Sequence, residues 1–183
     1  MAKKGKTISN NLTKQSVRFI QTAVDTGGQL LEMESRYLAH SKEPAMHYHP
    51  VQVEDFTVLE GELTVKMNDT ITTLHAGDKL HIPAGTSHAM WNNSNTITVV
   101  NWQIKPALNT EYLLETITGL ANDGKTNTHG IPNILQVALI GNRYGKVFRL
   151  SKPPYIVQKI VFTILSPFAW LMRYRSMYKK YID

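Results

Sequence analysis

One stretch, from residue 47 to residue 92, limits what this chain can fold into more than any other, because it combines metal-ligating side chains with turn residues. His47 and His49 are separated by one residue, and Glu54 follows after four more. His88 comes much later, after several glycine and proline residues that are typical of turns. Neutral imidazole and carboxylate groups are ligands that divalent transition metals accept in proteins. The sequence therefore predicts that these four residues meet at a metal ion.

The spacing of the four residues indicates strands rather than helices. Side chains two apart on a strand point to the same face, so His47 and His49 are expected side by side. Pro50 must interrupt that strand, since proline cannot donate a hydrogen bond to a sheet ladder. After it, Glu54 and Phe56 share a face. Since His88 comes from a distant strand, three imidazoles and one carboxylate are expected to converge inside an all-β container.

These residues resemble the two signature motifs of the cupin superfamily. The motifs read G-x5-H-x-H-x3,4-E-x6-G and G-x5-P-x-G-x2-H-x3-N, and the positions matched here are His47, His49, Glu54, Gly61, Gly77, Pro83, Gly85, His88 and Asn92. One position departs, because Ser41 stands where the family has its first glycine. The resemblance covers about residues 30 to 105. It implies an all-β fold, the double-stranded β-helix or jelly-roll barrel, with His47, His49, Glu54 and His88 as metal ligands.

The ligand set leaves one alternative open at Gln52, which shares strand parity with Glu54 and could replace it or support the ligands from behind. Glu54 is preferred because an anion offsets the charge of the metal. A degenerate site, whose polar groups only bond to each other, is disfavoured because burying them without metal or partners costs several kcal/mol. The donor set suits Fe, Mn, Ni, Cu or Zn.

Apolar residues around the motif predict a cavity beside the metal. Those expected to line it, with Gln52, are Met33, Tyr37, Phe56, Met90 and Trp102. An apolar cavity with few polar groups suits a small organic molecule. No lysine or arginine cluster lies within the motif, which argues against a sugar phosphate.

The chain length of 183 residues suits one domain with additions at its ends. We expect a basic N-terminal arm at 1–14, mobile over its first ten residues, a cupin barrel at 15–107 and a helical extension at 108–183. There is no cysteine, which excludes disulfides and thiolate ligands and fits a reducing compartment. No apolar run follows the basic start, so a secretory signal is not expected and the cytoplasm is the expected location.

Three helices are predicted in the extension, at about 109–121, from 134 to a stop at Gly141 or Gly145, and from 156 to 168 with Pro167 as a kink or end. The net charge of the chain is +6, and its last part is almost free of acidic residues. Only 13 residues separate Lys159 from Arg173, whereas a spanning helix needs about 20. The last apolar helix is therefore expected to pack on the barrel or on a dimer partner, with an amphipathic helix in a membrane interface as the alternative.

Two functional hypotheses follow from these observations. The first is a metal-dependent enzyme acting on a small organic molecule, an oxidoreductase of dioxygenase type by family analogy or, less favoured, an isomerase, with Glu54 also serving as general base. The second is a non-catalytic ligand-binding module whose basic helical tail docks to a membrane or a protein. The resemblance also implies a homodimer, and no nucleic-acid-binding motif is present.

Overall fold

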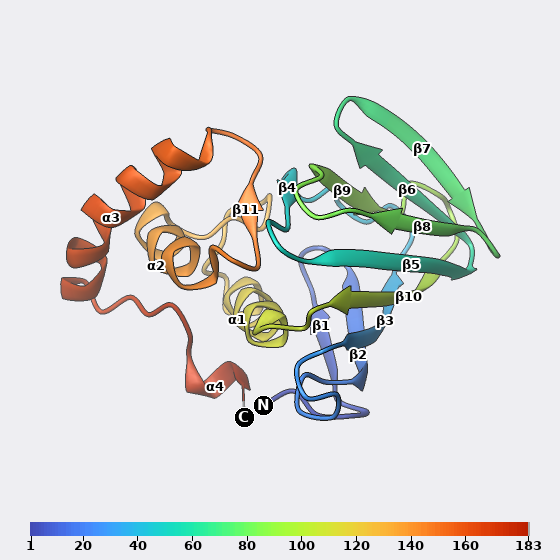
Figure 1. Cartoon of the computed structure of the whole chain (residues 1–183), viewed down its shortest axis with the longest axis horizontal. Helices are drawn as coiled ribbons and strands as arrows, with labels where there is room; N and C mark the ends of the chain where they lie inside the picture. The colour runs from blue at the N-terminus through green and yellow to red at the C-terminus, as the bar shows by residue number, and fades with distance from the viewer. Residues whose placement is uncertain (183) are drawn as a thin grey trace.

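Two antiparallel sheets form the core of this computed structural model, which describes residues 1–182 (Figure 1). The first sheet has the strand order β1 (Thr7–Asn10), β2 (Gln15–Gln21), β3 (Leu31–Tyr37), β10 (Thr98–Lys105), β5 (Val53–Glu60), β8 (Lys79–Ile82). The second has the order β11 (Arg149–Leu150), β4 (His47–Tyr48), β9 (His88–Trp91), β6 (Glu62–Met67), β7 (Thr70–His75). The two sheets confirm the predicted jelly-roll fold as a β-sandwich, and the closed barrel stays a prediction.

Alternation of buried and exposed residues explains why these segments are strands. In β3 the alternate residues Leu31, Met33, Ser35 and Tyr37 are buried, as the pattern predicts. In β5 the buried positions are Glu54, Phe56 and Val58, so a carboxylate takes its place in an otherwise apolar row. That placement brings Glu54 into the space between the two sheets.

The turn between β5 and β6 depends on Gly61. Its φ is +73°, a conformation that side chains with a Cβ rarely adopt. A Cβ at this position would also collide with the backbone carbonyl of Ile97. The strand that carries Glu54 is therefore connected to the opposite sheet through a position that only glycine can occupy.

Asn92 closes the second motif with its side chain rather than with its backbone. Its amide nitrogen donates to the carbonyls of Tyr37, Leu38 and Thr96, and its amide oxygen accepts from the backbone of Ser94. The buried Ser41 hydroxyl accepts a hydrogen bond of 2.8 Å from the Asn92 backbone. The serine that departs from the family motif thus bonds directly to the last residue of the second motif.

Four helices follow β10, namely α1 (Thr110–Asn122), α2 (Ile134–Tyr144), α3 (Tyr155–Leu171) and α4 (Lys179–Ile182). The three predicted helices are confirmed, and Gly145, not Gly141, ends the second. Pro167 lies inside α3, which continues to Leu171. Asn109 precedes α1, and its side chain makes no capping hydrogen bond. No helix among the described residues has the length and apolar character needed to cross a membrane.

The N-terminal segment differs from the mobile arm that was expected. Residues 7–10 form β1, which pairs with β2 from Thr7 opposite Arg18 to Asn10 opposite Gln15. The Lys6 ammonium lies 2.7 Å from the buried Glu115 carboxylate of α1, and the Asn122 amide donates to the Ser9 carbonyl. Backbone pairing on one side and helix contacts on the other hold this segment in place.

The helices form a layer beside the sheets rather than a coat around them (Figure 1). α1 contacts β1, α2 contacts α1 and α3, and α3 is the outermost. The contact between α2 and α3 is close at Gly141, where a Cβ would lie 2.5 Å from the Phe162 ring. The last long helix was expected to pack on the sheets or on a dimer partner. In this chain it packs mainly on α2, and near its start the Gln158 amide donates to the Leu150 carbonyl of β11; packing on a dimer partner stays a prediction.

Candidate metal centre

The four predicted ligands come from both sheets and meet between them. His47 in β4 is paired directly with His88 in β9, and His49 follows β4 immediately. Glu54 faces them from β5 in the other sheet. One ring nitrogen from each histidine lies within 4.8 Å of those of the other two. The structure thus brings together four residues that the sequence separates by up to 41 positions.

Each imidazole is held in one tautomer by a backbone carbonyl. The Nδ1 atoms of His47, His49 and His88 lie 3.0, 2.5 and 2.9 Å from the carbonyl oxygens of Ala45, Val147 and Thr86, respectively. A carbonyl can only accept, so Nδ1 must carry the proton. The Nε2 atom of each ring is then left with a lone pair, which is the form that ligates a metal.

Glu54 places a carboxylate oxygen against those lone pairs. Its Oε1 accepts a hydrogen bond of 2.9 Å from the Trp102 indole, while Oε2 lies 2.9 Å from His88 Nε2 and 3.3 Å from His49 Nε2. These three buried atoms have no hydrogen bond of acceptable geometry. Since all three are acceptors in the tautomers just described, they repel each other unless a proton or a cation lies between them. The donor set therefore fits a divalent metal ion.

The pKa values of the cluster reflect the same competition. Removal from water, followed by the neighbouring histidines, lowers the pKa of His47 to about 3, and burial likewise lowers the pKa of His49. Burial acts to raise the pKa of Glu54, but the histidines outweigh it and the net shift is downward. Burial acts to lower the pKa of His88, but its contact with Glu54 outweighs burial and the net shift is upward. Without a metal, His88 is thus the ring that takes up a proton.

A cavity of about 290 Å³ opens from the cluster and is mostly apolar. Of the residues expected to line it, Tyr37, Phe56, Met90 and Trp102 lie on its wall with the four ligands. Met33 shares the buried face of β3 with Tyr37 but lies farther along the strand, in a separate core cluster with Phe19 and Leu31.

Gln52 also lies off the wall. Its amide donates to the carbonyls of Pro106 and Ala107 and to the Thr110 hydroxyl. The side chain considered as a substitute ligand therefore ties the start of α1 to the strand that carries Glu54.

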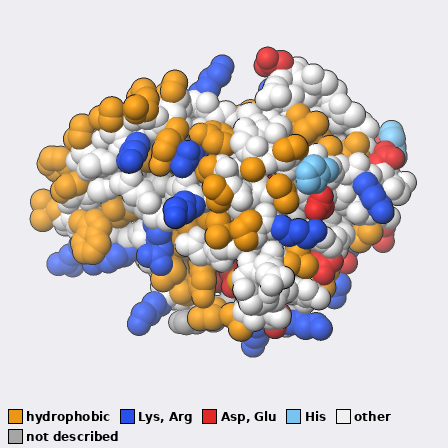
Figure 2. All heavy atoms as spheres, in the orientation of Figure 1, with side chains coloured by type: hydrophobic (Ala, Val, Ile, Leu, Met, Phe, Trp, Pro, Cys, Tyr) orange, Lys and Arg blue, Asp and Glu red, His pale blue; other side chains and the backbone are white. Residues whose placement is uncertain are grey.

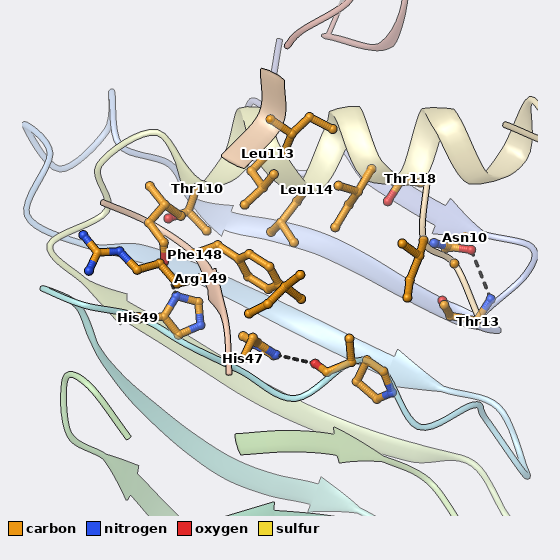
Figure 3. A pocket seen from close by; sticks show the side chains of 18 of the residues that line it. Asn10, Thr13, His47, His49, Thr110, Leu113, Leu114, Thr118, Phe148 and Arg149 are labelled. Atoms are coloured by element: carbon orange, nitrogen blue, oxygen red, sulfur yellow. Dashed lines mark hydrogen bonds between the residues drawn. The ribbon is translucent and has the colours of Figure 1, made fainter. Parts of the chain in front are cut away.

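The helical extension supplies the other half of the cavity wall (Figure 3). The Phe148 ring stacks on His47 at 4.7 Å between centroids, and Figure 3 shows it between the histidines and the α1 residues Leu113 and Leu114. β11 adds to the edge of the second sheet by pairing with β4, Leu150 opposite His47. The carbonyl that orients His49 belongs to Val147. The extension thus covers the site and also positions one of its ligands.

Sequence reasoning missed this contribution. β11 has only two residues, too few to show the alternation that marks a strand. The only local signal was an apolar residue before it, Phe148, in a segment without helical spacing.

Residues 34–103 match the family model described as a cupin domain. No curated protein matches the sequence.

Solved structures that resemble the chain are distant. A predicted oxalate decarboxylase from Thermotoga maritima is 19% identical, with 58% of this chain and 99% of that chain covered and a TM-score of 0.49. An RmlC-like cupin from Shewanella frigidimarina is 19% identical over 57% and 86%, with a TM-score of 0.48. A sugar phosphate isomerase of the cupin superfamily from Silicibacter pomeroyi is 19% identical over 55% and 70%, with a TM-score of 0.47. With its family match at residues 34–103 and both signature motifs filled from His47 to Asn92, this part of the chain is a cupin domain.

Proposed function

We propose that this protein is a metal-dependent enzyme of oxygenase type that acts on a small, largely apolar organic molecule. The observation that carries the proposal is the set of buried acceptor atoms on Glu54, His49 and His88, which have no hydrogen-bond partner and face an apolar cavity. These atoms repel each other unless a proton or a cation lies between them, and a divalent metal ion would satisfy all three at once.

The residues have distinct roles in this proposal. His47, His49, Glu54 and His88 would hold the ion, and Trp102 fixes the carboxylate by donating to its Oε1. A bound divalent transition metal would supply Lewis acidity or, for iron, manganese or copper, redox chemistry. Glu54 can also take a proton from the substrate through Oε2, which has no hydrogen bond of its own. The apolar wall excludes water and strengthens the electrostatic interactions in the site.

The charges around the cavity restrict the substrate class. The basic residues on the cavity wall, Lys42 and Arg149, are engaged elsewhere. Lys42 donates to the Thr128 carbonyl, and Arg149 stacks 3.4 Å from the Tyr155 ring and donates to the Gly145 carbonyl. A phosphate group would lack the charge-assisted hydrogen bonds that it normally receives. We therefore infer an apolar substrate that reaches the metal through an enol, phenol or ketone oxygen, with isomerisation as the next reaction class.

A non-catalytic metal or ligand carrier is the second candidate. It is favoured by the position of Glu54, the one carboxylate at the cluster, because both of its oxygens already face a partner or a prospective ligand. A group so occupied is less free to move protons than a carboxylate outside the ligand set.

The test begins with the metal. The protein is purified, its metal content is measured by mass spectrometry, and an anomalous difference map is collected from crystals. We expect one transition metal bound by the four residues, lost in His88→Gln and retained in His81→Gln, which changes an exposed histidine whose ring hydrogen-bonds to Asp55. The metal-loaded protein is then assayed for oxygen consumption with flavonols and β-diketones and for isomerisation of the same compounds.

The outcomes separate the candidates. Turnover that requires both the metal and Glu54 supports the enzyme. A fully loaded protein that binds these compounds without converting them supports the carrier. Absence of any metal at the cluster in protein exposed to iron, manganese, nickel, copper and zinc would overturn both the enzyme and the metal carrier.

A further inference from the structure

One side of α3 exposes a continuous apolar surface, which we call the α3 outer face. It consists of Ile156, Val157, Ile160, Val161, Ile164, Phe168 and Leu171, whose exposed fractions run from 38% for Val161 to 83% for Leu171. At 3.6 residues per turn these positions fall within an arc of roughly 140° of the helix. Isolated exposed apolar residues are ordinary, whereas a stripe along a whole helix indicates a contact that the chain alone does not provide.

The contacts of α3 with the rest of the chain do not use this face. Phe162 packs on Gly141 of α2, and the Gln158 amide donates to the carbonyls of Leu150 and Pro153. Gln158, Phe162 and Ala169 are the buried residues of the helix. The outer face therefore contributes little to folding, and its apolar character calls for another cause.

Charges around the outer face are of one sign. The segment from 124 to 182 holds no aspartate or glutamate, and its cations are Lys125, Arg143, Lys146, Arg149, Lys152, Lys159, Arg173, Arg175, Lys179 and Lys180. Lys152 and Lys159 lie before and within α3, and Arg173 and Arg175 follow it. In Figure 2 the apolar side chains run along the edge where Figure 1 places α3, with lysine and arginine side chains beside them. An apolar stripe with basic flanks is complementary to an anionic lipid surface.

We propose that the α3 outer face docks this protein on a membrane that contains anionic phospholipids, with α3 lying in the plane of the headgroups. The helix is too short and too charged at its ends to cross the bilayer, which leaves the interface as its place. Trp170 is 65% exposed beside the Arg175 guanidinium, 5.4 Å from its ring centroid, and tryptophan prefers the boundary between headgroups and acyl chains.

The charge pattern favours lipid over a second copy of the chain. A two-fold contact through α3 would bring the basic flanks of both copies together, and this segment has no carboxylate to compensate them. An anionic membrane supplies that compensation together with an apolar phase.

Vesicle flotation of the full chain tests the proposal. Vesicles of phosphatidylcholine alone are compared with vesicles that contain about a third phosphatidylglycerol. We expect flotation with the anionic vesicles, weakened by high salt, and little with the neutral ones. The double substitution Ile160→Asn and Ile164→Asn should lower the partition coefficient about tenfold or more, because two apolar side chains no longer enter the membrane. The double substitution Lys152→Gln and Lys159→Gln should lower the partition coefficient roughly tenfold on anionic vesicles only.

Matched variants control for changes in fold and in total charge. The pair Leu59→Asn and Ile71→Asn changes two exposed apolar residues on the sheets, and the pair Lys4→Gln and Lys79→Gln removes two exposed lysines far from α3 in sequence. Both control pairs should float as the parent protein does. Equal binding to neutral and anionic vesicles, or equal loss in test and control pairs, overturns the proposal. A third outcome also overturns it: the protein does not float but sediments as a dimer, and the Ile160→Asn and Ile164→Asn pair dissociates that dimer. The α3 outer face would then be a contact between two copies of the chain.

Discussion

Three backbone carbonyls decide which nitrogen of each clustered imidazole faces the cavity. Two of these carbonyls, those of Ala45 and Thr86, lie two residues before the histidines that they orient. The third, from Val147, is 98 residues away in the chain. At the residue scale the centre therefore has local support for His47 and His88 and long-range support for His49, so its parts should respond differently to substitution.

Removing the indole donor behind Glu54 should weaken metal binding. Trp102→Phe keeps an aromatic ring against Phe56 but deletes the hydrogen bond to Glu54 Oε1. Loss of such a supporting bond typically lowers metal affinity by about 10- to 100-fold. Competition with a fluorescent chelator measures the change. Trp91→Phe, at the half-buried end of β9, makes the same chemical change away from the carboxylate and should leave the affinity unaltered.

Metal affinity should fall as the pH falls, with a slope that reports a single proton. Burial is opposed by Glu54, which keeps the pKa of His88 above its usual value, whereas the pKa values of His47, His49 and Glu54 are lowered. Below the raised pKa of His88 the metal must displace one proton, so affinity should drop about tenfold per pH unit and level off above that pKa. Titrations at a series of pH values measure this slope. A slope near three would mean that all three rings are protonated together and would contradict the assignment.

At the scale of elements, the short segment that contains β11 joins the helices to the sheets. It pairs with β4 through its backbone, its Phe148 ring stacks on His47, and the Ser151 backbone donates to the Met46 carbonyl. Since this segment forms part of the cavity wall, a change in it should affect both stability and access to the metal.

Phe148→Ala should lower the free energy of unfolding by about 1–3 kcal/mol, less than for a fully buried phenylalanine because the ring is only half-buried. Urea denaturation measures the difference. Phe168→Ala, on the α3 outer face with 58% of its surface exposed, should change the free energy of unfolding by no more than about 0.5 kcal/mol. A larger effect at Phe168 than at Phe148 would contradict the described packing.

At the scale of the whole molecule, the parts that the sequence predicted are those set by local periodicity. Strand alternation placed Glu54 and Phe56 on one buried face. Helical spacing placed α1, α2 and α3, and α3 continues past Pro167 to Leu171. The side of the sandwich that the helices cover depends on pairings between residues about 100 positions apart, such as Leu150 with His47, which no local pattern records. Both sides of α3 carry apolar residues, so the sequence alone does not show which side of this helix faces the rest of the protein.

The hydrogen bond from His49 to Val147 has a thermodynamic consequence. The segment that contains Val147 both orients the His49 ring and covers the metal centre. Metal binding and ordering of this segment should therefore stabilise each other. Hydrogen exchange should register this as slower exchange of the amides of residues 147–151 when metal is added, with no change at 179–182. Residues 147–151 would then report, from outside both signature motifs, whether the centre holds a metal ion.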